Sequence, residues 1–132
     1  MKPTAGLCLA VAAGGALGAV LRHLLGLAVD DGSGFPITTF AINVTGCFAL
    51  GLLPPLAAAR GNRAWAVAIG PGLLGGFTTM SAYAEQARAL LDDGRTLLAS
   101  TYVAGTLLAC LAAVVIAGLL RPTRLEDRET HT

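Results

Sequence analysis

The sequence has few charged residues and few aromatic rings. Charged side chains make up only 13% of the 132 residues and aromatic ones 5%, whereas 55% are hydrophobic. Soluble domains carry about 25% charged residues, so this composition excludes an ordinary soluble domain and indicates a membrane protein. The formal net charge is only +1 and no basic run occurs, so a nucleic-acid partner is not expected.

Cysteine is also scarce. The three cysteines, Cys8, Cys47 and Cys110, all lie in apolar stretches, and their number is odd. This argues against a disulfide framework, and no cluster of cysteine or histidine has the spacing of metal ligands. Small packing residues are the favoured interpretation of all three. The sequence also shows no nucleophile paired with a base, so an enzymatic function is not expected.

Four long apolar stretches fill most of the chain. A helix needs about 20 apolar residues to cross a bilayer core, and each stretch meets that length. We therefore expect an all-α membrane protein in which residues 1–120 form a domain of four transmembrane helices. Residues 121–132 are expected to form a charged, disordered tail. The expected spans are 5–29, 37–58, 64–91 and 96–120.

Positive charges are distributed unequally between the two ends of these spans. With an even number of spans, both termini share a side of the membrane with the loop at 60–63. That side carries more Lys and Arg than the other, which favours cytoplasmic termini in the cell membrane. A chain that inserts in both orientations would show almost no bias. The first side holds Lys2, Arg60, Arg63, Arg121, Arg124 and Arg128, and the second holds Arg22, Arg88 and Arg95.

The third stretch is interrupted at its centre. Directly after Pro71, residues 72–81 read GLLGGFTTMS. Irregular backbone at membrane depth persists only where it is buried in protein or lines a water-filled path. Freed carbonyls can hold a cation, while freed N–H groups and hydroxyls can face an anion. We therefore predict a third helix that is broken at its centre, an ion site there, and an oligomer, since four helices are few for enclosing a path.

Three motifs occur in order along the first three stretches. Residues 14–22 read GGALGAVLR, residues 43–51 read NVTGCFALG, and residues 75–83 read GGFTTMSAY. Together with the length and the number of spans, they resemble the CrcB/Fluc family of fluoride-specific ion channels. The resemblance implies an antiparallel dimer of the dual-topology type, with two fluoride pores near the subunit interface. It also implies passive export of fluoride across the cytoplasmic membrane, which lowers its toxicity, and one structural sodium ion that is not transported.

The resemblance assigns the sodium ion to the third motif. In the family, backbone carbonyls at the positions of Gly75 and Thr78 hold this ion at the dimer centre. Hard cations take oxygen ligands, and a broken helix exposes carbonyl oxygens. A glycine-rich kink that serves packing alone is the alternative.

Polar residues near the break are candidates for the fluoride path. The family has a pore-lining asparagine at the position of Asn43 and a conducting serine at that of Ser81. Thr39 lies one helical turn before Asn43, on the same face, and extends the polar track. For Asn43, the alternative is a hydrogen bond that joins two helices.

Other candidates depart from the family pattern or lie farther from the break. The family usually has phenylalanines, whose electropositive ring edges flank the fluoride path, at the positions of Met80 and Tyr83. Tyr83 keeps a ring, whereas Met80 keeps only volume and polarisability. Tyr102 and Thr106 share a helix face and could complete the pore wall, or serve as an interfacial aromatic and a packing hydroxyl. Arg22 could attract anions to a vestibule, anchor neighbouring backbone or reach the membrane interface.

Two other functions remain open. The charge bias and the missing phenylalanines would suit a mainly structural subunit, paired with an oppositely oriented homologue in a heterodimeric fluoride channel. A homodimer is equally compatible with the motifs. A small proton-coupled multidrug exporter would need a membrane-buried carboxylate. The first, second and fourth stretches have no Asp or Glu between their ends, and Glu85 lies late in the third, so the exporter is the weaker alternative.

Overall fold

The computed structural model describes residues 4–32 and 34–120, with only the backbone described at 55–60. Within these ranges the chain is helical and has no strand. Three long helices are α1 (Ala5–Ala28), α2 (Ile37–Arg60) and α6 (Thr96–Leu119). The stretch between α2 and α6 is divided into α3 (Arg63–Val67), η1 (Ala68–Leu74), α4 (Gly75–Phe77) and α5 (Met80–Asp92). The expected tail at 121–132 lies outside the described residues.

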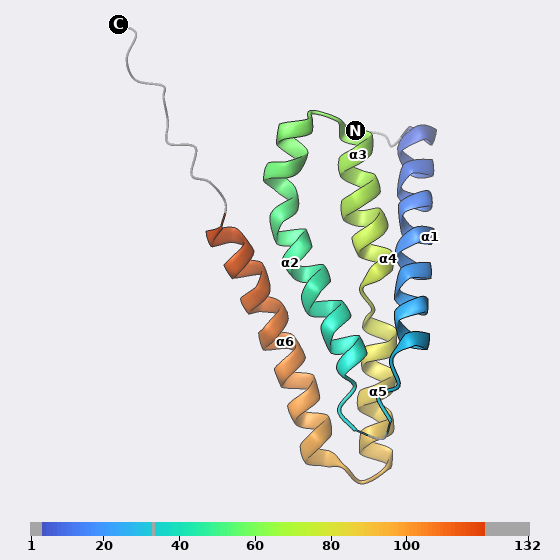
Figure 1. Ribbon diagram of the computed structural model, residues 1–132, viewed down its shortest axis with the longest axis vertical. Helices are drawn as coiled ribbons and strands as arrows, with labels where there is room; N and C mark the ends of the chain where they lie inside the picture. The colour runs from blue at the N-terminus through green and yellow to red at the C-terminus, as the bar shows by residue number, and fades with distance from the viewer. Residues whose placement is uncertain (1–3, 33, 121–132) are drawn as a thin grey trace, which may run out of the picture.

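Three of the described helices are long and apolar enough to cross a membrane. They cover Ala5–Ala28, Ile37–Pro54 and Thr96–Leu119. The divided stretch does not qualify, because no piece of it is long enough by itself. It nevertheless runs alongside α1 and α2, and α5 ends near the start of α6 (Figure 1). The expectation of an all-α fold is thus confirmed for the described residues, and three of its helices have the length and apolar character of membrane spans.

Turns between the helices are held by side-chain caps and by glycine. The Asp31 carboxylate accepts the Thr38 backbone N–H at 3.1 Å and the Thr38 hydroxyl at 2.7 Å, which ties the loop after α1 to the start of α2. Asn62 Oδ1 accepts the Trp65 N–H at 3.1 Å and caps α3. Gly94, with φ of 73°, allows the tight turn between α5 and α6.

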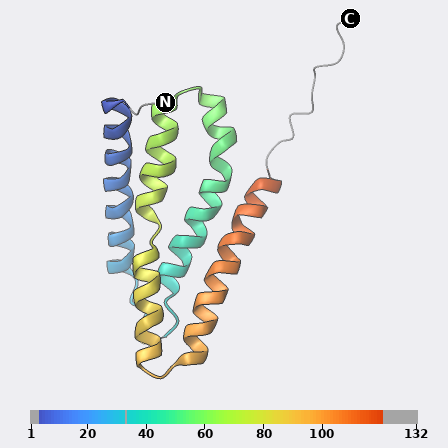
Figure 2. The same cartoon turned by 180° about the vertical axis from the view of Figure 1, so that it is seen from behind.

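Helix α1 packs against the divided stretch through glycines. A Cβ atom at Gly14 would overlap the Ala68 carbonyl oxygen, and one at Gly18 would overlap that of Leu73. Glycines four residues apart form a flat stripe that lets two helix backbones approach closely. This spacing places α1 directly beside η1 and α4, as both views show (Figures 1 and 2).

Helix α6 packs against α2 and α5 on the other side of the bundle. A Cβ atom at Gly51 would lie 2.6 Å from the Ala117 Cβ, so the α2–α6 contact also depends on a small residue. Between α5 and α6 lies a cluster of buried side chains with aromatic rings packed around it. The buried members are Ala87, Leu90, Ala99 and Tyr102, and the surrounding rings are Phe35, Phe40 and Tyr83.

Candidate functional site

The third apolar stretch is broken between α4 and α5, as the sequence predicts. Thr78 adopts an extended conformation (φ −73°, ψ 157°), and so does Thr79 (φ −146°, ψ 121°), before α5 begins at Met80. The preceding segment η1 is a π-helix that contains Pro71. Proline has no N–H to donate and disfavours a regular α-helix, and π-type turns are frequent at functional sites.

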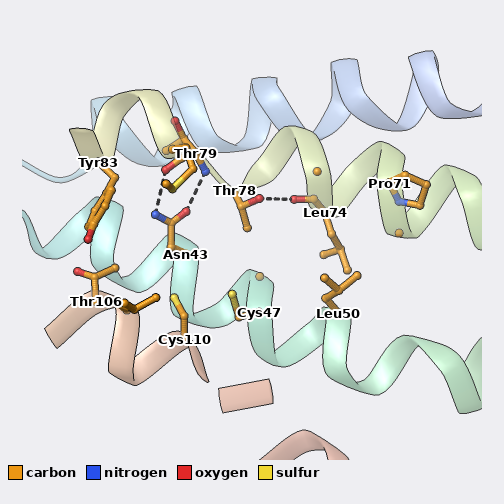
Figure 3. Close-up of a pocket in the computed structure, with 15 residues that line it drawn as sticks. Asn43, Cys47, Leu50, Pro71, Leu74, Thr78, Thr79, Tyr83, Thr106 and Cys110 are labelled. Carbon is orange, nitrogen blue, oxygen red and sulfur yellow. Dashed lines mark hydrogen bonds between the residues drawn. The ribbon is translucent and has the colours of Figure 1, made fainter. Parts of the chain in front are cut away.

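Asn43 of α2 holds the break in place. Its Nδ2 donates to the Thr79 carbonyl oxygen at 3.0 Å, and the Thr79 N–H donates to Asn43 Oδ1 at 2.8 Å (Figure 3). Both residues are buried, with exposed fractions of 8%. The Asn43 amide therefore supplies the hydrogen-bond partners that the Thr79 backbone lacks at the break. A buried backbone group requires such partners.

This pairing changes what the Gly75 carbonyl can bind. In a continuous helix, the Thr79 N–H would donate to the Gly75 carbonyl four residues earlier; here it donates to Asn43 instead. The Thr78 N–H and hydroxyl both donate to the Leu74 carbonyl at 3.0 Å. The Ala82 N–H, which would donate to the Thr78 carbonyl in a continuous helix, donates to Thr79 Oγ1 instead. The backbone oxygens of Gly75 and Thr78 thus lack these helical donors, and such oxygens suit a hard cation.

The start of α5 has the opposite electrostatic character. Thr79 Oγ1 accepts the Ala82 N–H at 3.1 Å and so caps the helix, and it lies 3.2 Å from Ser81 Oγ. The N-terminal turn of a helix carries a partial positive charge, and the C-terminal turn a partial negative one. The break therefore combines a surface suited to an anion with carbonyls suited to a cation.

A cavity of about 700 Å³ lies beside the break. Tyr83 and Thr106 stand at one of its ends, and Pro71 and Leu50 at the other (Figure 3). The structure brings six of the predicted residues to this cavity from α2, the divided stretch and α6. They are Asn43, Gly75, Thr78, Met80, Tyr83 and Thr106.

Thr106 presents a buried polar atom to the same cavity. The residue is 3% exposed, and its hydroxyl oxygen has no hydrogen-bond partner within the described part of the chain. Buried polar groups in folded proteins nearly always have a partner. The Thr106 hydroxyl is therefore a candidate contact for an ion or a water molecule.

Both tyrosine hydroxyls near the break have protein partners. The Tyr83 hydroxyl donates to the Val103 carbonyl at 2.8 Å, and that of Tyr102 donates to Gln86 Oε1 at 2.9 Å. The two ring centroids are 5.2 Å apart. Tyr83 thus contributes its ring to the cavity lining, whereas Tyr102 is fully buried behind it and supports it. Sequence alone gave no signal for the Tyr83–Val103 bond.

A second cavity of about 310 Å³ lies on the other side of Thr79. Its lining includes Arg22, Asp31, Thr39 and Gln86, so its character is more polar than that of the first cavity. Arg22 also donates from Nε to the Gly76 carbonyl at 3.4 Å and so contacts the backbone of the broken stretch. The predicted Arg22 and Thr39 therefore meet here, and Thr79 lines both cavities.

The three sequence motifs converge on the break. The first motif packs its glycines against η1 and α4, and the second places Asn43 against Thr79. A Cβ atom at Gly46 would overlap the Thr78 methyl group, so this glycine gives the break room beside α2. The sequence did not identify the partners of Gly14, Gly18 and Gly46, which became clear only from the structure. Ser81, in contrast, is exposed and lines neither described cavity.

Comparison with known proteins finds a matching family and several similar proteins. The family described as CrcB-like protein, Camphor Resistance (CrcB), matches residues 9–119. The fluoride-specific ion channel FluC 2 of Nocardia farcinica is 46% identical over 115 residues, covering 82% of this chain and 79% of the relative. The fluoride-specific ion channel FluC of Paracoccus denitrificans is 46% identical over 112 residues, covering 84% and 90%. That of Caulobacter vibrioides is 42% identical over 117 residues, covering 85% and 91%.

These relatives are named as ion channels, not as enzymes, which agrees with the function class that the sequence indicates. The family match covers all three motifs and, apart from the first residues of α1, the helices that form the break and its cavities. The chain therefore belongs to the CrcB family.

Proposed function

We propose that this chain is a subunit of a fluoride-selective channel that exports fluoride passively across the cytoplasmic membrane and so lowers its toxicity. The observation that carries the proposal is the Asn43–Thr79 pairing at the helix break, in a chain whose relatives are named fluoride-specific ion channels. Passive export needs a polar path and no covalent chemistry.

The fluoride path is proposed to run past Asn43 between the two cavities. Fluoride is small and strongly hydrated, so donors in a narrow path must replace the water that it loses. An asparagine amide carries two N–H groups, and the described contacts use one of them for the Thr79 carbonyl. The second can donate to an anion, with Thr39 on one side and Thr106 on the other as further hydroxyl contacts.

The functional unit is proposed to be an antiparallel dimer in which the divided stretch forms a fourth membrane crossing. Met80 lines the cavity yet is 76% exposed in the single chain, so a second subunit would cover it. The excess of Lys and Arg on the side of the termini supports cytoplasmic termini. In the antiparallel arrangement, the oppositely inserted subunit would have its termini on the other side.

A structural sodium ion at the dimer centre is part of this proposal. The Gly75 and Thr78 carbonyls would hold it, because the break leaves these oxygens without their helical donors. When bound, a cation at this point would supply positive charge and join the broken stretches of two subunits. Oxygen donors alone match the preference of a hard cation.

A heterodimer with an oppositely oriented homologue is the second candidate. Met80 stands where the family usually has a phenylalanine, and its thioether has no electropositive ring edge to offer an anion. A partner with both rings could then supply the conducting pore. The multidrug-exporter alternative gains no support, because Glu85 is exposed and pairs with Arg88 at 2.7 Å instead of lying in a cavity.

Fluoride efflux from liposomes tests the proposal. We expect the chain, alone or with a homologue, to release fluoride much faster than chloride without any proton gradient. Equal release of chloride would contradict the selectivity, and a requirement for a proton gradient would favour an exporter. A stable, conducting homodimer formed by the chain alone would exclude an obligate partner.

A further inference from the structure

Two cysteines from different helices meet in the larger cavity. Cys47 of α2 and Cys110 of α6 both line it, and both are free and partly buried. Their side chains lie beside each other in the middle of the cavity wall (Figure 3). The two thiols lie close enough to interact electrostatically with each other. The third cysteine, Cys8, is exposed on α1 and lines none of the described cavities.

We propose that Cys47 and Cys110 form a two-thiol binding site for a soft divalent cation of the Hg²⁺ class. Soft thiolate ligands select soft metal ions, and a linear two-coordinate ion needs only two sulfur atoms. The described residues contain no group of three or more His, Cys, Asp or Glu side chains that could hold a metal of higher coordination number. This inference does not depend on the proposed transport function.

The charge balance favours a divalent ion. Two S–H bonds break, two S–Hg bonds form, two protons pass to water, and no electron is transferred. The product is electrically neutral. A monovalent soft ion on two thiolates would leave a net negative charge, which is costly among the apolar neighbours Leu50, Leu74 and Leu107.

A buried hydroxyl beside Cys110 also lacks a hydrogen-bond partner among the described residues. Thr106 precedes Cys110 by one helical turn on the same face of α6. Its buried hydroxyl, which lines the cavity, is the one unpartnered buried side-chain atom found among the described residues. This independent observation indicates that a water molecule or an ion enters the cavity next to the thiol pair, so that the thiols are reachable from it.

Mercury retention tests the site directly. The purified chain with Cys8→Ser would receive one equivalent of HgCl₂ and then a wash with about 10 µM monothiol, a hundredfold below the millimolar effective concentration of a second tethered ligand. We expect one retained mercury per chain by elemental mass spectrometry. Adding Cys47→Ser or Cys110→Ser should lower retention about a hundredfold, because each leaves a single thiol that the wash can outcompete. Cys8→Ser itself is the matched control and should retain as much as the unmodified chain.

A second measurement, of cysteine reactivity, needs neither Cys47→Ser nor Cys110→Ser. In the unmodified chain, one equivalent of Hg²⁺ should protect Cys47 and Cys110 together from maleimide, as read by peptide mass spectrometry, while Cys8 stays reactive. The proposal is overturned if a single-thiol variant keeps its mercury, if the Cys8→Ser chain keeps none, or if the metal joins two chains on a non-reducing gel.

Discussion

Asn43 and Thr79 exchange two hydrogen bonds across 36 residues of sequence, and this pair joins α2 to the break in the third apolar stretch. The amide accepts from the Thr79 N–H and donates to its carbonyl, so it replaces both partners that an unbroken helix would provide. A side chain thereby takes over the role of backbone at the point where the ion site is proposed.

Removing the Asn43 amide should cost both stability and transport. In Asn43→Ala, the Thr79 N–H and carbonyl stay buried without partners, which costs about 1–3 kcal/mol for each group. We expect a lower unfolding temperature in detergent and loss of fluoride efflux. Asn62→Ala is the control, since Asn62 caps α3 at an exposed position. Unchanged efflux in Asn43→Ala would remove this residue from the path.

The close approach of α1 to the divided stretch predicts a sharp contrast between two glycines of one helix. Gly18→Ala would place a Cβ on the Leu73 carbonyl oxygen, whereas a Cβ at Gly26 meets nothing within 4 Å. Overpacking of this kind costs about 1–3 kcal/mol. Thermal unfolding in detergent should show a clear loss for Gly18→Ala and almost none for Gly26→Ala. Equal stability of the two variants would mean that α1 lies farther away.

The Tyr83 hydroxyl is bonded to Val103, so the ring and not the hydroxyl should serve the cavity. Tyr83→Phe removes one hydrogen bond, worth about 0.5–1.5 kcal/mol, and keeps the ring. We expect a slightly lower stability with fluoride efflux retained, and loss of efflux in Tyr83→Ala. If Tyr83→Phe abolished efflux, the hydroxyl itself would have to contact the ion.

Sodium dependence can separate a backbone site from a side-chain site. Thr78→Val keeps the carbonyl and the shape of the residue but loses the hydroxyl bond to the Leu74 carbonyl. A ligand that binds only the folded state raises its stability with concentration. Sodium should therefore raise the unfolding temperature of Thr78→Val as it does that of the unmodified chain, with N-methylglucamine as the control cation. A sodium effect present only in the unmodified chain would transfer the ligand role to the hydroxyl.

The sequence predicts the break better than it predicts what holds the break. Pro71 and the polar run after it indicate irregular backbone, because lipid cannot satisfy free peptide groups. The partner of Thr79 is harder to infer, since Asn43 precedes it by a whole helix and no local pattern links them. Its sequence position was consistent with either a pore residue or an interhelical bond, and the structure shows the bond while leaving one N–H for the other role.

Side-chain direction limited the remaining site predictions. Helical spacing places Thr39 and Asn43 on one face of α2, but they line different cavities, because Thr79 lies between these cavities. Tyr102 and Thr106 share a face of α6, yet only Thr106 reaches the larger cavity, since the ring of Tyr102 packs behind Tyr83. Periodicity identifies the face of a helix but not which element covers it.

The position of Asn43 ahead of the break has a consequence for biosynthesis. Chains are made and fold from the N-terminus, so α2 emerges from the ribosome before Thr79 does. Asn43 is therefore already present when the broken segment enters the bilayer. The Thr79 N–H and carbonyl can then form their hydrogen bonds without first being exposed to lipid. A permuted chain in which α2 follows the broken segment would lose this advantage and should insert less efficiently.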